Sequence, residues 1–328
     1  MQTIKRCFLM LAVGVGVVQT GAAMSQTTYP DRAIKMIVAW PAGGGTDNVA
    51  RLVAKFLSER LKQPIVVENK SGASGVIGTE YAAKAVPDGY TIQYTVADSH
   101  SINPHVFKNV SFDALKDFIP VAVVGSMPNV LVANNSVQAS NMAEFLKLAR
   151  AEPDRFTYAS WGIASGAHIR TEAFNKEAKI KLRHIPYQGS GPAFAAIVGQ
   201  QVDVMMVPLG LAYATAKAGK VKILGVDTLQ RVVEAPEIPT FTEMGIPVSL
   251  AFWQGILVPA KTPVDVVIRL NKEMNEILAD SKVRQALLGV GVTVRSNDLQ
   301  SLAQLKTYMA DEYQRWGSVI RNAQITEK

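Results

Sequence analysis

Apolar and polar positions follow two periods along this chain. Short apolar runs, typical of buried strands, alternate with segments in which apolar residues recur every three or four positions, as on one face of a helix. The expected strands cover residues 34–40, 64–69, 90–96, 156–160, 182–186, 202–207 and 221–226. The expected helices begin near residues 46, 75, 141 and 262, and a last helix carries Leu299, Leu302, Leu305, Met309, Trp316 and Ile320. Capping boxes are expected at two of these starts, one formed by Asn141 with Glu144 and one by Thr262 with Asp265. This alternation predicts an α/β fold with parallel strands covered by helices.

Two longer extended runs stand out from this pattern. One covers residues 121–133 and is interrupted by Met127-Pro128, and the other covers residues 250–258. They bracket a middle block of about 120 residues, judged by where the pattern changes. We therefore expect two α/β lobes joined by two crossing strands, with a ligand cleft between them. Lobe 1 would comprise residues 24–126 and 255–328, and lobe 2 residues 127–254.

Residues 1–23 have the features of a secretory signal peptide. Lys5 and Arg6 precede an apolar run of 11 residues at 8–18, and small residues follow at 21–23. Such a run is too short to span a bilayer, which disfavours the alternative of an uncleaved anchor helix. The pattern predicts export to the periplasm or beyond.

Composition narrows the possible ligands. The formal net charge is +7, and loss of Lys5 and Arg6 leaves +5, which mildly favours anionic ligands. Clusters of Lys and Arg with interleaved aromatic residues are absent, so nucleic acid is not an expected partner. The single cysteine, Cys7, falls in the signal peptide, so we expect no disulfide and no thiolate metal site.

Four loops rich in glycine and hydroxyl residues follow predicted strands and precede predicted helices. They cover residues 41–47, 71–78, 159–168 and 187–194. Ligands of α/β proteins bind at the carboxyl ends of strands, and the N–H groups at a helix start favour anions. Two loops come from each lobe, so together they could clamp a carboxylate. Neither a P-loop nor the dinucleotide glycine pattern occurs, and no cofactor is expected.

Other interpretations of the same residues stay open. The first loop could be a tight turn in which Thr46 or Asp47 caps the helix, and the second a flexible loop. Asp203, inside an apolar strand, either forms local hydrogen bonds or faces the cleft. His100 and His105 flank Pro104 and do not share a helical face, so no metal site is predicted.

An enzyme is a further alternative. Ser160, Ser165 or Ser190 could act as a nucleophile with His168 as its base. The G-x-S-x-G nucleophile elbow is absent, however. His168 also lies three positions after Ser165 near a helix start, a spacing typical of capping. A secreted serine hydrolase is therefore disfavoured.

The chain resembles the Bug-type extracytoplasmic solute-binding receptors of tripartite tricarboxylate transporters. The matching motifs occur in the family's order through nearly the whole chain after the signal peptide. They are "YPDRAIKMIVAWPAGGGTDNVAR", "VVENKSGASGVIG", "AVPDGYT", "FIPVAVVG", "HIPYQGSGPA", "IPTFTEMGIP", "WQGILVPAKTP" and "EYQRW". The ordered set is far more specific than any single loop.

The resemblance implies a type II periplasmic-binding-protein fold and a small ligand, usually a carboxylate, held between the lobes. It also implies delivery to a membrane permease with one large and one small subunit. We expect a periplasmic, monomeric receptor without catalytic activity, and the alternative is a sensing module for a signalling partner. Carried over by position, the candidate ligand-binding residues are Trp40, Gly43, Gly44, Thr46, Asp47, Ser71, Gly72, Ser160, Gly162, Ser165, His168, Gly189 and Ser190, to which Asp203 is added from its strand position.

Two departures from the family pattern suggest a hypothesis about the ligand. Trp40 stands where phenylalanine is more common, and Val207-Pro208 stands where an aromatic residue and aspartate are usual. Both changes favour a less polar distal pocket, suited to an aromatic or aliphatic acid.

Overall fold

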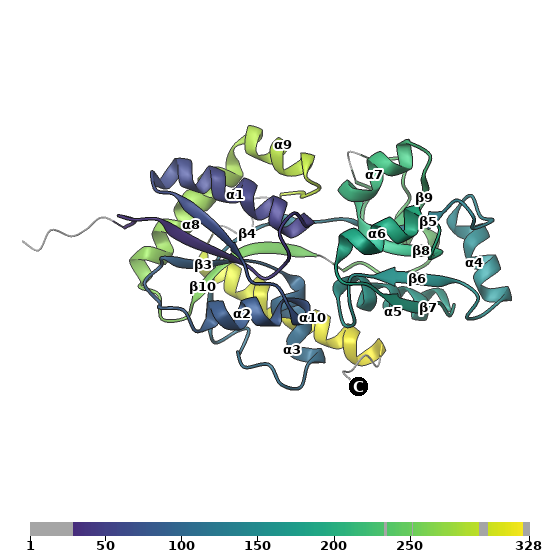
Figure 1. The fold of residues 1–328 in the computed structure, drawn as a ribbon, viewed down its shortest axis with the longest axis horizontal. Coiled ribbons are helices and arrows are strands. Elements are labelled where there is room, and N and C mark those ends of the chain that lie inside the picture. The colour runs from purple at the N-terminus through teal and green to yellow at the C-terminus, as the bar shows by residue number, and fades with distance from the viewer. Residues whose placement is uncertain (1–28, 233–234, 251, 295–300, 324–328) are drawn as a thin grey trace, which may run out of the picture.

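The computed structural model describes residues 29–232, 235–250, 252–294 and 301–323. Within these residues the strands form two five-stranded sheets that lie side by side (Figure 1). We call the part of the molecule built on the first sheet lobe 1 and the part built on the second sheet lobe 2. The predicted signal peptide at residues 1–23 and the helical position Leu299 lie outside the described residues.

The first sheet has the strand order β2-β1-β3-β10-β4. Strands β1 (Ile34–Val38), β2 (Ile65–Asn69) and β3 (Thr91–Val96) are parallel to one another. Strand β10 (Trp253–Pro259) runs antiparallel to both of its neighbours, β3 and β4 (Phe118–Ser126). A segment from late in the sequence thus completes the sheet of the N-terminal part.

The second sheet has the strand order β7-β6-β8-β5-β9. Strands β6 (Thr157–Ser160), β7 (Arg183–Pro186) and β8 (Val204–Pro208) are parallel. Strand β5 (Asn129–Asn134) runs antiparallel to β8 and to β9 (Val221–Val226). The five strands are consecutive in sequence, in agreement with one α/β unit inserted into another.

The expected parallel pairing holds for β1, β2 and β3 and for β6, β7 and β8, but each sheet also contains antiparallel pairs, and the cause is the crossing chain. Strand β5 starts where the chain enters lobe 2, and its first residue, Asn129, pairs with Pro208 at the end of β8. Strand β10 likewise starts where the chain returns to lobe 1, and Gln254 pairs with Val96 at the end of β3. Strands β5 and β10 therefore run antiparallel to β8 and β3, respectively. The same pairs place the carboxyl ends of β3 and β8 at the junction between the lobes.

Helices of lobe 1 follow the predicted apolar periodicity. Helix α1 (Gly45–Leu61) buries Val49, Val53 and Leu57 along one face. The other helices are α2 (Val76–Ala83), α3 (Asn103–Val106), α8 (Val264–Ala279), α9 (Ser281–Gly289) and α10 (Leu302–Ala323). Helix α10 contacts β4 in lobe 1 and a helix of lobe 2, so it links the two lobes (Figure 1).

Lobe 2 contains α4 (Met142–Ala151), α5 (Gly166–Ala178), α6 (Ser190–Val198) and α7 (Leu209–Lys217). Helix α5 is the lobe 2 helix that α10 contacts. The predicted capping box of α4 is confirmed, because Asn141 accepts a hydrogen bond from Glu144 N and the Glu144 carboxylate accepts one from Ser140 N. No helix among the described residues combines the length and the apolar character that crossing a membrane needs.

The capping box predicted for α8 is wrong. The hydroxyl of Thr262 donates to the carbonyl of Pro259 at 2.8 Å and does not cap the helix. Pro263 occupies the cap position itself, one residue before the first helical turn. The Thr262 hydroxyl is already bonded within the tight turn that follows β10, and the spacing of residues in the sequence does not reveal this bond.

Candidate ligand-binding site

The two glycine-rich loops of lobe 1 pack against each other. Gly75 has φ +93°, and a Cβ atom built on it would lie 3.3 Å from the Trp40 ring and 2.9 Å from Ser99 Oγ. Only a glycine allows Trp40, from the end of β1, to approach the start of α2 this closely. The first and second predicted loops therefore form one surface at the end of the first sheet.

The second loop contacts the third across the junction. Ser74 Oγ donates to the carbonyl of Ile163 at 3.4 Å. The third and fourth loops are joined by their backbones, since Tyr187 N donates to Ser160 O at 2.9 Å and Gly189 N donates to Trp161 O at 3.3 Å. The four loops thus form a continuous series of contacts, and the structure brings together the candidate residues that they carry.

Three of the four helix starts beside these loops have no side-chain cap. Helices α1, α2 and α6 are preceded by Gly44, Gly75 and Gly189, none of which has an oxygen on its side chain to accept a backbone N–H. The first N–H groups of a helix lack intrahelical partners and carry the positive end of its dipole. The starts of α1 and α6 are therefore suited to an anionic group, and so are the N–H groups of α2 that follow Val76, whose own N–H already donates to Ala73 O.

Thr46 and Asp47 do not cap helix α1. The helix begins one residue before Thr46, at Gly45, with Gly44 in the cap position. Thr46 is partly buried in the first turn of the helix. Ser71 is exposed, and Gly72 adopts φ +141° and accepts a hydrogen bond from Gly75 N that closes the second loop.

Asp47 shapes the first loop from within. Its side chain is buried and accepts hydrogen bonds from Gly43 N at 2.8 Å, Arg51 Nε at 2.9 Å and Asn69 Nδ2 at 2.8 Å. Burial alone would raise the pKa of Asp47, but these hydrogen bonds hold it below its usual value. The carboxylate is fully engaged, so Asp47 positions the loop and is not placed to contact a ligand.

Asp203 lies away from the junction. Its carboxylate accepts hydrogen bonds from Thr157 N and Thr157 Oγ1, both at 2.7 Å. Its own carbonyl accepts from Asn134 N, at the end of β5 that is remote from the crossing. The assignment of Asp203 as a ligand-binding residue is corrected to the local hydrogen-bond alternative, because the start of β8 is opposite to the end that faces lobe 1.

Ser165 and His168 form a helix cap. Ser165 Oγ accepts a hydrogen bond from the backbone N–H of His168 at 3.4 Å, while the His168 ring accepts one from Ala164 N at 3.0 Å through Nδ1. The serine hydroxyl thus contacts the histidine backbone and not its ring. This arrangement does not activate Ser165 as a nucleophile.

Ser160 pairs with a different histidine. Its Oγ lies 2.7 Å from His184 Nε2, and the His184 ring stacks on the His168 ring with centroids 4.0 Å apart. Burial lowers the pKa of His184 to about 4 and that of His168 to about 3, so both rings are neutral at physiological pH. Ser160 is fully buried, and within the described ranges no carboxylate orients the His184 ring. The Ser160–His184 contact is therefore better explained as stabilising the loop than as a catalytic pair for hydrolysis.

The sequence analysis missed a fifth segment at the junction. After β3 the chain forms one π-helical turn, Asp98–Ile102, in which all five residues are buried. Such turns are frequent at functional sites. The sequence of residues 97–101, "ADSHS", directly follows a predicted strand and contains polar residues, as the other four loops do. It was missed because the search asked for glycine-rich loops, and this segment has no glycine.

Asp98 of this turn contacts lobe 2, and Ser99 lies beside Gly75 in lobe 1. Asp98 Oδ1 accepts a hydrogen bond from Gly166 N at 2.8 Å, and Asp98 Oδ2 accepts one from Trp161 Nε1 at 3.4 Å. Ser99 Oγ and Trp40 Nε1 are both buried, and within residues 29–232, 235–250, 252–294 and 301–323 neither has a hydrogen-bond partner. Buried polar atoms are rarely left unpaired, so these two donors, which lie beside the glycine-rich loops, are candidate ligand contacts.

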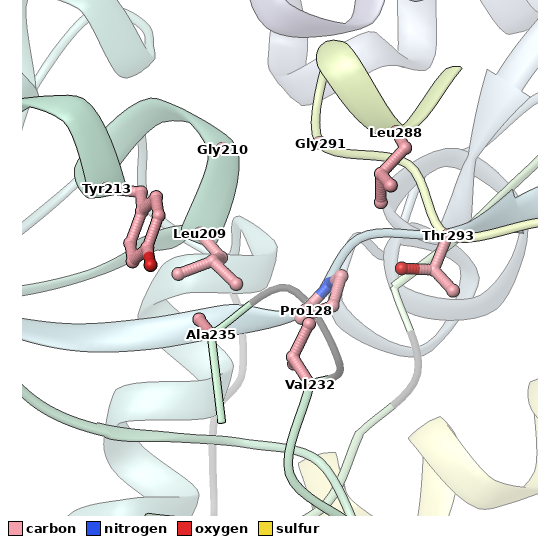
Figure 2. Close-up of a pocket in the computed structure, with 9 residues that line it drawn as sticks. All are labelled: Pro128, Leu209, Gly210, Tyr213, Val232, Ala235, Leu288, Gly291 and Thr293. Carbon is pink, nitrogen blue, oxygen red and sulfur yellow. The ribbon is translucent and has the colours of Figure 1, made fainter. Parts of the chain in front are cut away.

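An apolar pocket elsewhere at the junction does not fit an anion. Figure 2 shows it between Leu209 and Tyr213 of α7 and Leu288 and Thr293 near α9, with Pro128 at its base. Its volume is about 90 Å³, and its lining includes no charged side chain and none of the predicted site residues. In the described part of the chain, no group of three or more His, Cys, Asp or Glu side chains could hold a metal ion.

Comparison with known proteins identifies the family. A family model described as "Tripartite tricarboxylate transporter family receptor" matches residues 49–325. The chain belongs to this family. It is 33% identical over 321 residues to protein BugT of Bordetella pertussis, a match that covers 95% of this chain and 96% of BugT.

Two solved structures that hold a carboxylate have the same fold. Rpa4515 of R. palustris with adipate is 29% identical, with a TM-score of 0.86 over 91% of this chain and all of that one. MatC of Rhodopseudomonas palustris with bound malate is 30% identical, with a TM-score of 0.82 over 89% of this chain and all of that one. The predicted family and the two-lobed periplasmic-binding-protein fold are confirmed.

Proposed function

We propose that this receptor is periplasmic, captures a small carboxylate in a cleft between its lobes and delivers it to a membrane permease with one large and one small subunit. We assign residues 24–126 and 255–328 to lobe 1 and residues 127–254 to lobe 2, except that Trp253 and Gln254 belong to lobe 1 because they pair with β4 and β3. The observation that carries the proposal is the pair of unpartnered buried donors, Trp40 Nε1 and Ser99 Oγ, beside the uncapped start of α2.

The physical argument concerns donors that are already in place. The starts of α1, α2 and α6 present N–H groups without side-chain caps, and the two unpartnered donors lie on the same face of lobe 1. A hydrogen bond to a charged group contributes roughly 1.5–3 kcal/mol, so four or five could give micromolar affinity after ordering costs. Adipate and malate in two relatives support a carboxylate as the ligand class.

Thermal unfolding of the purified protein tests the proposal. Ligands that bind only the native state raise the melting temperature in proportion to the logarithm of their concentration. We expect at least one small mono- or dicarboxylic acid in a broad panel to raise it, while the primary amide of the same acid does not. A panel without any shift, or equal shifts from acids and amides, would contradict carboxylate recognition.

A further inference from the structure

The carboxylate of Asp98 reaches from lobe 1 to the start of a helix in lobe 2. Asp98 is 1% exposed, and its two oxygens accept hydrogen bonds from Gly166 N, the first residue of α5, and from Trp161 Nε1. A Cβ atom built on Gly166 would lie 2.7 Å from Asp98 Oδ1. The glycine thus allows the carboxylate to sit directly on the helix start.

Helix α5 differs in this respect from the three other helices beside the candidate site. Helices α1, α2 and α6 have no side-chain cap, whereas α5 is capped by Ser165 and by Asp98 from the opposite lobe. The one helix start already satisfied by a negative charge is therefore in lobe 2. The Asp98 carboxylate satisfies the N–H group and the positive end of the dipole at the start of α5, as the carboxylate of a ligand would.

Other charges near Asp98 do not offset it fully. Arg170 of helix α5 is buried and forms an ion pair with Asp227. The carboxylate of Glu312, on α10, is also buried and attracts the Arg170 guanidinium. The Arg170 guanidinium thus lies in the field of three carboxylates, those of Asp98, Asp227 and Glu312, and Glu312 also pairs with Arg315 at 3.6 Å. Among the groups that act electrostatically on Asp98, Arg170 is the cation, and its single charge is shared with Asp227 and Glu312.

We propose that Asp98 is a specificity-determining residue that fills the start of α5 with the protein's own carboxylate and restricts the ligand to acids with a single carboxylate. The inference rests on the proposed receptor function and concerns which acids the site accepts. A monocarboxylate would use the donors of lobe 1 and place its uncharged end towards Asp98. A second carboxylate on the ligand would meet Asp98 at close range, and like charges in a buried site repel strongly.

Matched acid pairs test this inference by isothermal titration calorimetry. The pairs are butanoate with succinate, hexanoate with adipate, octanoate with suberate, and benzoate with terephthalate. Because burial raises the pKa of Asp98 to about 7, titrations at about pH 8 keep its carboxylate ionised. We expect the wild-type protein to prefer the monocarboxylate of any pair that binds, and Asp98→Asn to reduce this preference at least about tenfold.

Two further variants separate charge from folding. Asp98→Ser provides a second neutral variant should the asparagine variant fold poorly, and Asp113→Asn removes an exposed lobe 1 carboxylate and should leave the preference unchanged. A wild-type protein that prefers dicarboxylates, or an unchanged preference in both Asp98 variants, overturns the inference alone. Failure of every acid to bind overturns the receptor proposal and this inference together.

Discussion

Gly166 N donates a hydrogen bond to Asp98 Oδ1 at 2.8 Å and joins the two lobes at the start of helix α5. The bond depends on the absence of a side chain at Gly166, because a Cβ atom there would also lie 2.9 Å from the Phe252 ring. Phe252 belongs to the second crossing segment, just before β10. One glycine therefore sets how closely the lobes meet.

Substitution of this glycine is predicted to destabilise the protein. In Gly166→Ala the new methyl group overlaps Asp98 Oδ1, and overpacking of a tight site typically costs about 1–3 kcal/mol. Urea unfolding measures the loss. Gly289→Ala serves as the control, because nothing lies within 4 Å of a Cβ built there. Equal stability of the two variants would show that the contact at Gly166 is not tight.

The buried carboxylate of Asp98 predicts a distinctive pH dependence. Burial raises its pKa to about 7, above the value of about 3.9 expected in the unfolded chain. The native state then binds more protons than the unfolded state between these values, so the contribution of Asp98 to stability falls as pH rises from about 4 to about 7. The free energy of unfolding of Asp98→Asn minus that of the wild type should therefore increase over this range.

Comparison at matched pH isolates this effect from other titrating groups. Asp227, whose pKa burial raises to about 6, and the neutral histidines His168 and His184 are present in both proteins and cancel in the difference. Urea denaturation at intervals between about pH 4 and pH 8 gives the difference curve. A flat curve would mean that Asp98 titrates near its ordinary value.

Loss of the Ser99 hydroxyl is predicted to weaken binding without weakening the fold. Ser99 Oγ has no partner among the residues that the structure describes, so Ser99→Ala removes no internal hydrogen bond. For a bound acid the loss of one hydrogen bond of about 1 kcal/mol lowers affinity about fivefold. Calorimetric titration and thermal unfolding measure both quantities. Ser318→Ala, which removes an exposed hydroxyl of α10, should change neither affinity nor stability appreciably.

Asp203 is predicted to have the opposite profile. Asp203→Ala removes both hydrogen bonds to Thr157 at the end of the sheet remote from lobe 1, so stability should fall by about 1–3 kcal/mol while affinity is unchanged. Asp154→Asn is the control, because it removes the charge of an exposed carboxylate paired with Lys181 and keeps a residue that tolerates the left-handed backbone at φ 62°, so it should have little effect on stability. Reduced affinity at full stability would restore Asp203 to the binding site.

Much of the fold follows from local pattern. The spacing of Val49, Val53 and Leu57 predicts α1, and the pair Asn141 and Glu144 predicts the start of α4, because both depend on residues within a few positions of each other. The direction of β5 and β10 could not be predicted in this way. Their pairing depends on where the chain crosses between the lobes, which is a long-range property.

The candidate site shows the same division. Glycine-rich loops before helices were recognisable in the sequence because backbone donors require that local pattern. The engagement of Asp47 with Asn69, and of Asp98 with Gly166, joins residues 22 and 68 positions apart. Whether a carboxylate faces a ligand or its own chain is decided by such distant partners, so residue type and position alone did not separate Asp47 and Asp203 from ligand-binding residues.

A crystal structure of the protein with the acid that gives the largest thermal shift tests the central claim most directly. The account predicts a carboxylate between the lobes, within hydrogen-bond distance of Ser99 Oγ or Trp40 Nε1 and of the N–H groups at an uncapped helix start. An acid bound outside the junction, or one whose carboxylate contacts neither of these two side chains, would contradict it.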